Sequence, residues 1–268
     1  AGYLPADVVT NDALAARLDD FTAAGGCIIA SGRTSFRDEH WEPRLQPALK
    51  SLGIEQVLYI RDDMRSSYFH LKETKADLPR MAESDLIYMD GPYVYADYDA
   101  DSRPLLKLVP PHWFGPPERC YYTQVTEHPG FVVHPYGAGK AVYLPWLPGA
   151  LFYRQGYPNT SEFLGDLLEH VAGLEPVGGN LSPMVEVTHY SVADQFDLVH
   201  LVNMSGHFGV SFFAPVEMAD VEVTVRYPQP PVSVKSLVTG QVYEHSWRDG
   251  RLTVQVPKLA EFEALRIA

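Results

Sequence analysis

The feature that most constrains the fold of this 268-residue chain is a change of hydrophobic pattern near residue 178. Before it, segments with apolar residues three and four positions apart alternate with short apolar runs, as in domains that mix helices and strands. After it, short runs alternate apolar and polar residues without any helical period. About seven such runs are typical of an antiparallel β-sandwich. Strands are predicted over 184–190, 196–203, 210–215, 221–227, 232–238, 241–247 and 251–256. The sequence therefore predicts an α/β domain over 1–177 and a β-sandwich over 178–268.

The first domain is predicted to begin with a helix over 11–24, whose apolar face holds Leu14, Leu18 and Phe21. A Gly pair ends this helix, because glycine tolerates the left-handed conformation at helix ends. The run CIIAS (27–31) then predicts a buried strand. Further segments are predicted as helices over 43–52 and 161–172, strands over 55–60, 66–72 and 85–91, and a hairpin over 131–146. The helix–glycine–strand alternation indicates a Rossmann-like α/β sheet.

Cys27 raises the question of a nucleophile, because it lies between glycines in GGCIIASG (25–32). In a nucleophile elbow the strand comes first, the nucleophile ends it, and a helix follows. Here the order is reversed, since the Gly pair ends a helix and Cys27 opens the strand. Free cysteine is among the most buried residue types. We therefore interpret Cys27 as a structural residue.

Composition excludes several classes of function. A net charge of −13 disfavours non-specific binding of nucleic acid. Two Cys cannot form a disulfide framework, and no apolar run approaches the roughly 20 residues of a membrane span. The amino terminus lacks the pattern of a signal peptide, so a cytoplasmic location is the expectation. No HExxH or CxxC motif is present, and we expect no metal and no cofactor.

Adjacent or alternating carboxylates occur at three places and leave a glycosidase-like pair open as an alternative. They are Asp38 with Glu39, Asp62 with Asp63, and the run Asp97, Asp99 and Asp101. The run DYDAD (97–101) is loop-like and could bind calcium, but it lacks the Gly and closing Glu of an EF-hand loop, which favours solvated carboxylates. We therefore predict no catalytic residue from these groups.

The segment 144–160, LPWLPGALFYRQGYPNT, is the most unusual in composition. Aromatic side chains with an arginine are typical of surfaces that bind sugar rings or a protein partner. The alternative is a loop that buries its aromatic side chains locally. A second such stretch, SGHFGVSFFAP (205–215), is expected at the seam between the two domains. The candidate ligand or interface residues are Trp146, Phe152, Tyr153, Arg154, Tyr157, His207 and Phe208.

Several segments of the sequence resemble the carboxyl-terminal part of bacterial glycoside hydrolases related to the β-galactosidases of family 42. They are AARLDDFTAAGGCIIASGRTSFRDE, PYGAGKAVYLPWLPGALFYRQGYPNT, GNLSPMVEVT and LVHLVNMSGHFGVSFFAP. The resemblance covers nearly the whole chain. It implies a flavodoxin-like trimerisation domain, similar in fold to class I glutamine amidotransferases but without their nucleophile, followed by a β-sandwich.

The resemblance also implies what the chain lacks. The family's catalytic glutamates lie on a (β/α)8 barrel of about 250 residues, for which this chain has no room beside its two domains. The first strands of the flavodoxin-like domain also have no counterpart here. The chain is therefore expected to be the carboxyl-terminal portion of a longer hydrolase. Its expected partners are the amino-terminal catalytic barrel of the same polypeptide and further copies of itself.

The function expected from this resemblance is non-catalytic: assembly of the enzyme and framing of its substrate, in carbohydrate metabolism. Two alternatives come from other classes of protein. One is a carbohydrate-binding module that uses the aromatic residues of 144–160 and the sandwich. The other is an autonomous enzyme, either amidotransferase-like with Cys27 at its centre or a small hydrolase with a carboxylate pair.

Overall fold

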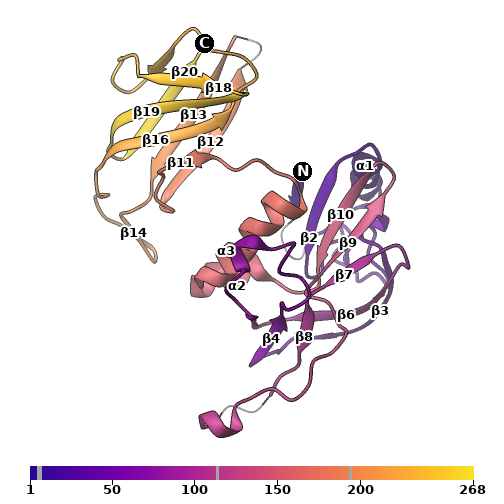
Figure 1. The fold of residues 1–268 in the computed structure, drawn as a ribbon. Coiled ribbons are helices and arrows are strands. Elements are labelled where there is room, and N and C mark those ends of the chain that lie inside the picture. The colour runs from indigo at the N-terminus through magenta and orange to yellow at the C-terminus, as the bar shows by residue number, and fades with distance from the viewer. Residues whose placement is uncertain (5–7, 113–114, 193–194) are drawn as a thin grey trace. The chain divides into compact units, whose positions relative to one another are not determined.

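The computed structural model of the chain describes residues 1–4, 8–112, 115–192 and 195–268. These residues form two compact units, Ala1–Leu174 and Glu175–Ala268, a few residues from the boundary expected at 177/178. Figure 1 shows that each unit is built mainly from sheets. Each unit also has a hydrophobic core of its own.

The largest sheet of the first unit has the strand order β1-β2-β10-β9-β7. Strands β1, β2 and β10 are parallel, whereas β9 and β7 run antiparallel to their neighbours. The predicted strand 27–31 is confirmed, and all five of its residues are buried. The predicted hairpin is confirmed as β9 and β10. The bounds are β1 Gly2–Leu4, β2 Cys27–Ser31, β7 Arg103–Leu105, β9 Phe131–Tyr136 and β10 Gly139–Leu144.

Helix α1 (Asp12–Ala23) lies beside this sheet (Figure 1), and the Asn11 side chain caps it by accepting a hydrogen bond from the Leu14 amide. The helix is confirmed, but its predicted inward face is only partly correct, since Leu18 is half-buried against the core. Leu14 and Phe21 are exposed, and the buried positions are Ala15, Asp19 and Thr22. A polar residue is buried here because the Asp19 carboxylate accepts hydrogen bonds from the backbone amides of residues 50 and 51.

The end of α1 lies directly against the β9–β10 turn. The amide of Ala138 donates to the Ala23 carbonyl at 2.8 Å, and the Lys140 amide donates to the Gly26 carbonyl at 3.1 Å. A Cβ atom on Gly137 would lie 2.6 Å from the Ala23 backbone, and one on Gly139 would collide with backbone carbonyl oxygens of α1 and of Gly26. Glycine is therefore required in this turn by the close approach of two backbones.

The alternation of helices and parallel strands does not continue beyond β2. The helix predicted over 43–52 is wrong, because only a short 3-10 helix forms at Lys50–Leu52, and Pro43 and Pro47 remove amide donors from the preceding segment. The next strand, β3 (Ile54–Arg61), pairs antiparallel with β6 (Tyr93–Tyr98) in a separate two-stranded sheet. The first unit thus combines several sheets with few helices, and the flavodoxin-like assignment stays a prediction.

A three-stranded antiparallel sheet of order β5-β4-β8 covers another side of the core. Its middle strand carries Phe69, which is fully buried against Trp146. The strands predicted over 66–72 and 85–91 are confirmed as β4 and β5. The bounds are β4 Ser67–His70, β5 Leu86–Met89 and β8 Lys107–Val109, with short 3-10 helices at Pro79–Met81 and Pro117–Arg119.

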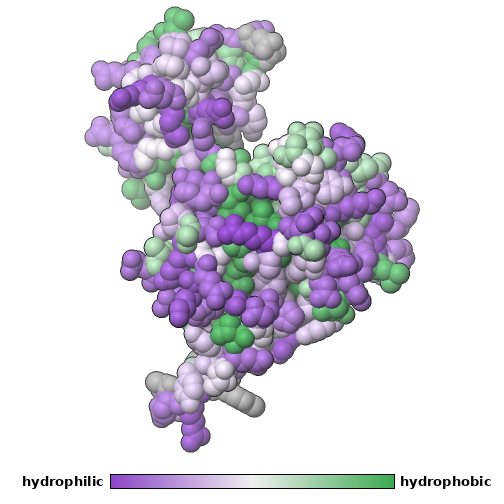
Figure 2. Space-filling model, turned by 45° about the vertical axis from the view of Figure 1, so that its right-hand side comes forward, coloured by the Kyte–Doolittle hydropathy of each residue, from purple (hydrophilic) through white to green (hydrophobic). Residues whose placement is uncertain are grey.

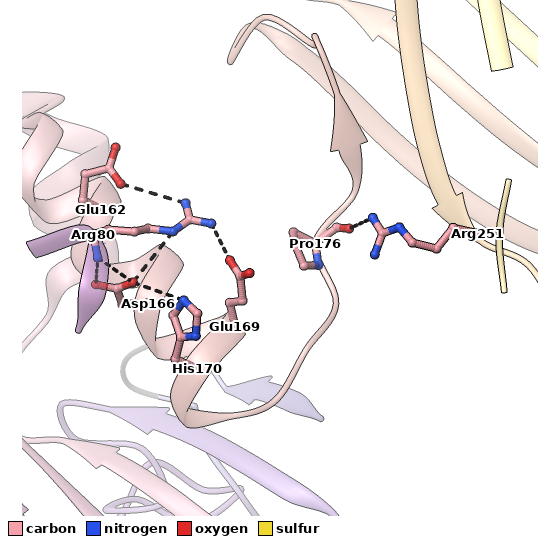
Figure 3. Close-up of polar contacts among 7 residues, drawn as sticks. All are labelled: Arg80, Glu162, Asp166, Glu169, His170, Pro176 and Arg251. Carbon is pink, nitrogen blue, oxygen red and sulfur yellow. Dashed lines mark hydrogen bonds and ion pairs between the residues drawn. The ribbon is translucent and has the colours of Figure 1, made fainter. Parts of the chain in front are cut away.

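The first unit ends in helix α3 (Pro158–Asp166), which continues as one π-helical turn at Leu167–Val171. This confirms the predicted helix, although it begins earlier and Leu168 is exposed. Figure 3 shows how Arg80 holds it: the Arg80 amide donates to both oxygens of the buried Asp166 carboxylate, at 3.2 and 3.0 Å, and its guanidinium contacts Glu169 at 2.5 Å. Burial raises the pKa of Asp166, and the backbone hydrogen bonds and nearby positive charge oppose that rise.

The second unit consists of two four-stranded sheets, of order β11-β16-β19-β18 and β12-β13-β20-β17, as expected for a β-sandwich. The Arg251 guanidinium of this unit donates to the Pro176 carbonyl at 3.3 Å (Figure 3). All pairs in both sheets are antiparallel. The bounds are β11 Gly178–Gly179, β12 Val185–Val192, β13 Phe196–Asn203, β16 Met218–Arg226, β17 Val234–Ser236, β18 His245–Arg248, β19 Arg251–Leu259 and β20 Phe262–Ile267.

Two details of the sandwich differ from the sequence interpretation. The run 210–215 is not a sandwich strand, because it forms a small exposed hairpin of β14 (His207–Phe208) with β15 (Ser211–Phe212). The last strand, β20, was not among the predicted runs. It carries Glu263, a buried carboxylate in the core, which accepts hydrogen bonds from the hydroxyls of Ser236 and Tyr243, each at 2.8 Å.

Candidate functional site

The segment 144–160 is not the irregular loop that its Pro and Gly content indicated. Helix α2 occupies Pro148–Gln155, with proline at a first-turn position, where its missing amide is tolerated. Gly156 ends α2 in the left-handed conformation, and α3 begins two residues later. The prolines and glycines therefore mark helix ends here.

Trp146 does not contribute to a surface, so its assignment as a ligand or interface residue is corrected. The side chain is fully buried, and its indole nitrogen donates to the Gly130 carbonyl at 2.8 Å. The ring centroid lies 5.0 Å from that of Phe69 and 5.8 Å from that of Phe163. Trp146 is thus the centre of the first unit's main core, which explains part of the segment's aromatic content.

The remaining candidates of this segment lie on the surface. Tyr153 is 90% exposed on α2, while Phe152 and Tyr157 are partly exposed. Arg154 is exposed, and its guanidinium has no hydrogen bond or ion pair with any residue that the structure describes. The local fold thus leaves the Phe152 and Tyr153 rings and the Arg154 guanidinium of α2 open to solvent. The ring of Tyr157, the residue before α3, is partly open as well.

A row of rings extends this surface across the three-stranded sheet. Tyr68 on β4 lies directly opposite Tyr88 on β5, with ring centroids 5.7 Å apart. Tyr157 meets the Tyr88 ring edge to face at 5.5 Å, and His112 lies 5.8 Å from Tyr68 at the other end. We call Tyr68, Tyr88 and Tyr157 the tyrosine row. Tyr68 and Tyr88 lie on the opposite face of the sheet from buried neighbours such as Phe69. Both are half-buried, and Tyr88 also packs against the edge of the core.

Opposite charges border the tyrosine row. Burial raises the pKa of the Tyr88 phenol. The negative charge of Asp90 and the neighbouring tyrosines raise this pKa further, whereas the Arg154 guanidinium lowers it. Gly91 places its backbone close to Arg154, since a Cβ atom there would lie 3.6 Å from the guanidinium. Aromatic faces with a carboxylate and a guanidinium at the edge can bind a sugar ring or the side chains of a protein partner. They supply no general acid–base pair.

The structure therefore brings together Phe152, Tyr153, Arg154 and Tyr157, and adds two tyrosines that sequence reasoning missed. The signal for them was present in the alternation of SYFH and LIYM, where Tyr68 and Tyr88 occupy outward positions of two strands. The other two candidates, His207 and Phe208, lie on the hairpin of the second unit, where the His207 ring stacks on Phe212 at 4.8 Å. Both hairpin residues are exposed.

Several of the carboxylates considered for chemistry are held in local hydrogen bonds or ion pairs. Asp62 pairs with Arg33, and Asp38 accepts hydrogen bonds from the amides of His40 and Glu42. A groove of about 880 Å³ near α1 is lined by both charged and apolar residues. Of its carboxylates, Asp12 is paired with Arg44 at 2.7 Å and Asp19 accepts hydrogen bonds from two backbone amides. Within the described ranges, no three His, Cys, Asp or Glu side chains gather as metal ligands.

Cys27 opens β2 and is buried, as its position after the helix-ending glycines predicted. Burial raises the pKa of its thiol, and the positive charges of Lys140 and the amino terminus only partly offset this. The thiolate, which is the reactive form, is thereby disfavoured. The environment is that of a core cysteine rather than of a nucleophile.

We expect Cys27 to be unreactive in the native protein. In a Cys120→Ser variant, a thiol reagent should modify Cys27 on the order of 100-fold more slowly than in denaturant, because reaction requires opening of the sheet. The rate is followed by absorbance over a range of pH. Rapid modification with a midpoint below the ordinary thiol range would instead identify an activated nucleophile.

No known family profile and no curated protein matches this sequence. Solved structures of glycoside hydrolases do match its fold. An α-L-fucosidase, isoenzyme 2 from Paenibacillus thiaminolyticus, superposes with a TM-score of 0.70 at 19% identity over 99% of this chain and 40% of that chain. A β-galactosidase from Bacillus circulans sp. alkalophilus gives a TM-score of 0.61 at 16% identity over 98% of this chain and 32% of that chain. A second β-galactosidase, from Rahnella sp. R3, gives a TM-score of 0.54 at 15% identity over 97% of this chain and 31% of that chain.

At these identities the likeness establishes the fold alone. The chain has, over nearly its whole length, the fold found in one part of these glycoside hydrolases. It spans less than half the length of each of them. Among the described residues, no helix combines the length and apolar character needed to cross a bilayer.

Proposed function

We propose that this chain is a non-catalytic part of a glycoside hydrolase, related to the β-galactosidases, that assembles the enzyme and frames its substrate. The observation that carries the proposal is the extent of the fold likeness. Two kinds of glycoside hydrolase match 97–99% of this chain with only 31–40% of their own length. Both units of this chain match these hydrolases together, and most of each hydrolase lies outside the match. This is the pattern expected of an accessory part of a longer enzyme.

The finer assignments belong to the same proposal. The first unit corresponds to the trimerisation-type, flavodoxin-like domain, and the β-sandwich follows it. Its partners are a catalytic barrel in the same polypeptide and further copies of the chain. The exposed rings of α2 and the tyrosine row are the contact surface, because aromatic and arginine side chains contribute strongly to binding at interfaces.

The DNA that precedes the codon for Ala1 tests this proposal directly. An open reading frame that continues upstream and encodes a barrel with two carboxylates at its strand ends would support it. A stop codon followed by a start signal immediately before Ala1 would contradict it, since the chain would then be expressed without a catalytic part.

We expect the chain by itself to have no glycosidase activity. Purified protein should hydrolyse none of a panel of aryl α- and β-glycosides, because its aromatic surface offers no carboxylate pair across a bound sugar. The measurement is release of the chromophore over several hours against a buffer blank. Turnover that co-purifies with the chain and disappears in one Asp→Asn or Glu→Gln variant would show that the chain is an autonomous enzyme.

We expect the exposed rings of α2 to support assembly rather than folding. A Tyr153→Ala variant should keep the wild-type melting temperature, since the ring is 90% exposed, and should weaken self-association in analytical ultracentrifugation by about tenfold. Val232→Ala, at a 92% exposed position of the second unit, is the matched control and should change neither. Unchanged association in Tyr153→Ala would remove α2 from the contact surface.

Carbohydrate binding is the second candidate function for the first unit, and the tyrosine row is the observation that favours it. The rings of Tyr68 and Tyr88 lie on one face of a sheet, and Tyr157 contacts Tyr88. The nearby Arg154 guanidinium has no hydrogen bond or ion pair with any residue that the structure describes. If this surface binds sugar, Tyr157→Ala should abolish saturation transfer from the protein to a neutral oligosaccharide in nuclear magnetic resonance. If it binds a partner subunit, the same variant should alter association only.

A further inference from the structure

The outer face of one sandwich sheet carries a second group of rings. In sheet β12-β13-β20-β17 the inward positions are filled by core residues such as Val199, Leu201 and Leu265. Because side chains alternate along a strand, Tyr190 of β12, His200 of β13 and Phe262 of β20 all point to the opposite, outer face. These three strands are neighbours, so the rings cross the sheet from its edge toward its middle.

The three rings form a continuous row. The centroid of His200 lies 5.7 Å from that of Tyr190 and 5.6 Å from that of Phe262. Tyr190 is 55% exposed and Phe262 is 43% exposed. The row is thus an open aromatic surface on a regular, hydrogen-bonded sheet, which fixes its spacing more firmly than a loop would.

One end of the row opens into a cavity of about 410 Å³. Phe262 belongs to both the row and the cavity, whose other walls include Pro215, Glu217 and Glu261. The Glu217 carboxylate pairs with Lys258 at 2.7 Å. The Glu261 side chain has no hydrogen bond or ion pair with any residue in the described part of the chain, so its acceptor oxygens remain open to a ligand.

The chemistry of this surface selects a class of ligand. Aromatic rings cover the apolar faces of sugar rings, while the hydroxyl groups need both donors and acceptors. Glu261 supplies acceptors, the His200 imidazole can donate or accept, and the Arg266 guanidinium, which lies over the Phe196 ring at 4.6 Å, supplies donors. The carboxylates at the cavity disfavour an anionic ligand. A cavity of about 410 Å³ is large enough for a sugar ring.

We propose that the second unit binds a neutral saccharide on this face. One sugar ring occupies the cavity against Phe262, with its hydroxyls on Glu261, and the following sugar lies along His200 toward Tyr190. This inference does not rest on the proposed function, because every group that carries it lies within the sandwich and acts without a catalytic barrel or a partner subunit.

The test uses the full chain and three defined probes: lactose, cellotriose and xylotriose. Saturation-transfer nuclear magnetic resonance identifies which probe binds, and titration calorimetry gives its dissociation constant. We expect at least one probe to bind, and both Phe262→Ala and Tyr190→Ala to weaken it about fivefold or more, the effect of losing one aromatic contact. Glu261→Gln should weaken the same probe while melting at the wild-type temperature.

Leu45→Ala, at a 95% exposed position of the first unit, is the matched control and should leave this affinity unchanged. The proposal is overturned if none of the probes binds, or if Phe262→Ala and Tyr190→Ala, both checked for wild-type circular dichroism, bind as the wild type does. Binding that is lost in Tyr157→Ala alone assigns the sugar to the first unit and also overturns it. Concentration-dependent self-association that Phe262→Ala abolishes would show that a second copy of the chain covers this face.

Discussion

A Trp146→Ala variant should lose about 3–5 kcal/mol of unfolding free energy, in the range of large aromatic deletions from protein cores. The ring has no exposed surface and contacts Phe69 and Phe163, so its removal leaves a cavity between the sheets and α3. The Gly130 carbonyl would also lose its hydrogen-bond donor. Urea unfolding followed by circular dichroism measures the loss.

Trp41→Ala is the control for this variant, because Trp41 is 64% exposed and should cost less than about 1 kcal/mol. If both variants lost similar amounts, Trp146 would not be the centre of the core. If Trp146→Ala instead kept its stability and lost self-association, the sequence interpretation of Trp146 as an interface residue would be restored.

The second large effect is expected at Glu263, in the core of the sandwich. Glu263→Ala should cost about 3 kcal/mol, because it creates a cavity and leaves the buried hydroxyls of Ser236 and Tyr243 without their acceptor. Glu244→Ala, an exposed carboxylate of the same unit, should change the stability by no more than about 0.5 kcal/mol.

A double-mutant cycle between Glu263→Ala and Tyr243→Phe separates the hydrogen bond from the cavity. The two changes should not be additive, since each removes one partner of the same 2.8 Å contact. Additive losses would mean that the hydroxyl does not depend on Glu263, and the buried carboxylate would then require another explanation.

The sequence predicted well those elements whose pattern follows from local chemistry. CIIAS is a buried strand because five apolar or small residues in succession fit a strand covered on both faces. The glycine-containing hairpin and most sandwich strands follow from alternation and turns. The position of Cys27 after a helix-ending Gly pair also indicated correctly that it is buried.

The errors arise where long-range contacts override the local pattern. In α1 only Leu18 of the predicted apolar stripe packs against the core. The helix approaches the sheet closely through Ala15, and Asp19 receives amides from a segment 31 residues away. The 144–160 segment joins one core residue, Trp146, to surface residues, and composition alone cannot separate them. The tyrosine row depends on the pairing of β4 with β5, which the sequence of either strand does not specify.

The contact between the end of α1 and the β9–β10 turn has a consequence for recognising relatives. Because two backbones touch there, a side chain is excluded at Gly137 and Gly139, whatever the rest of the sequence becomes. A chain that keeps this contact can therefore diverge as far as the 14–19% identity between this chain and the solved hydrolases and still need glycine at these positions. A search weighted toward a Gly-x-Gly turn, placed after a helix that ends in Gly-Gly, would detect distant copies of this unit that overall similarity misses.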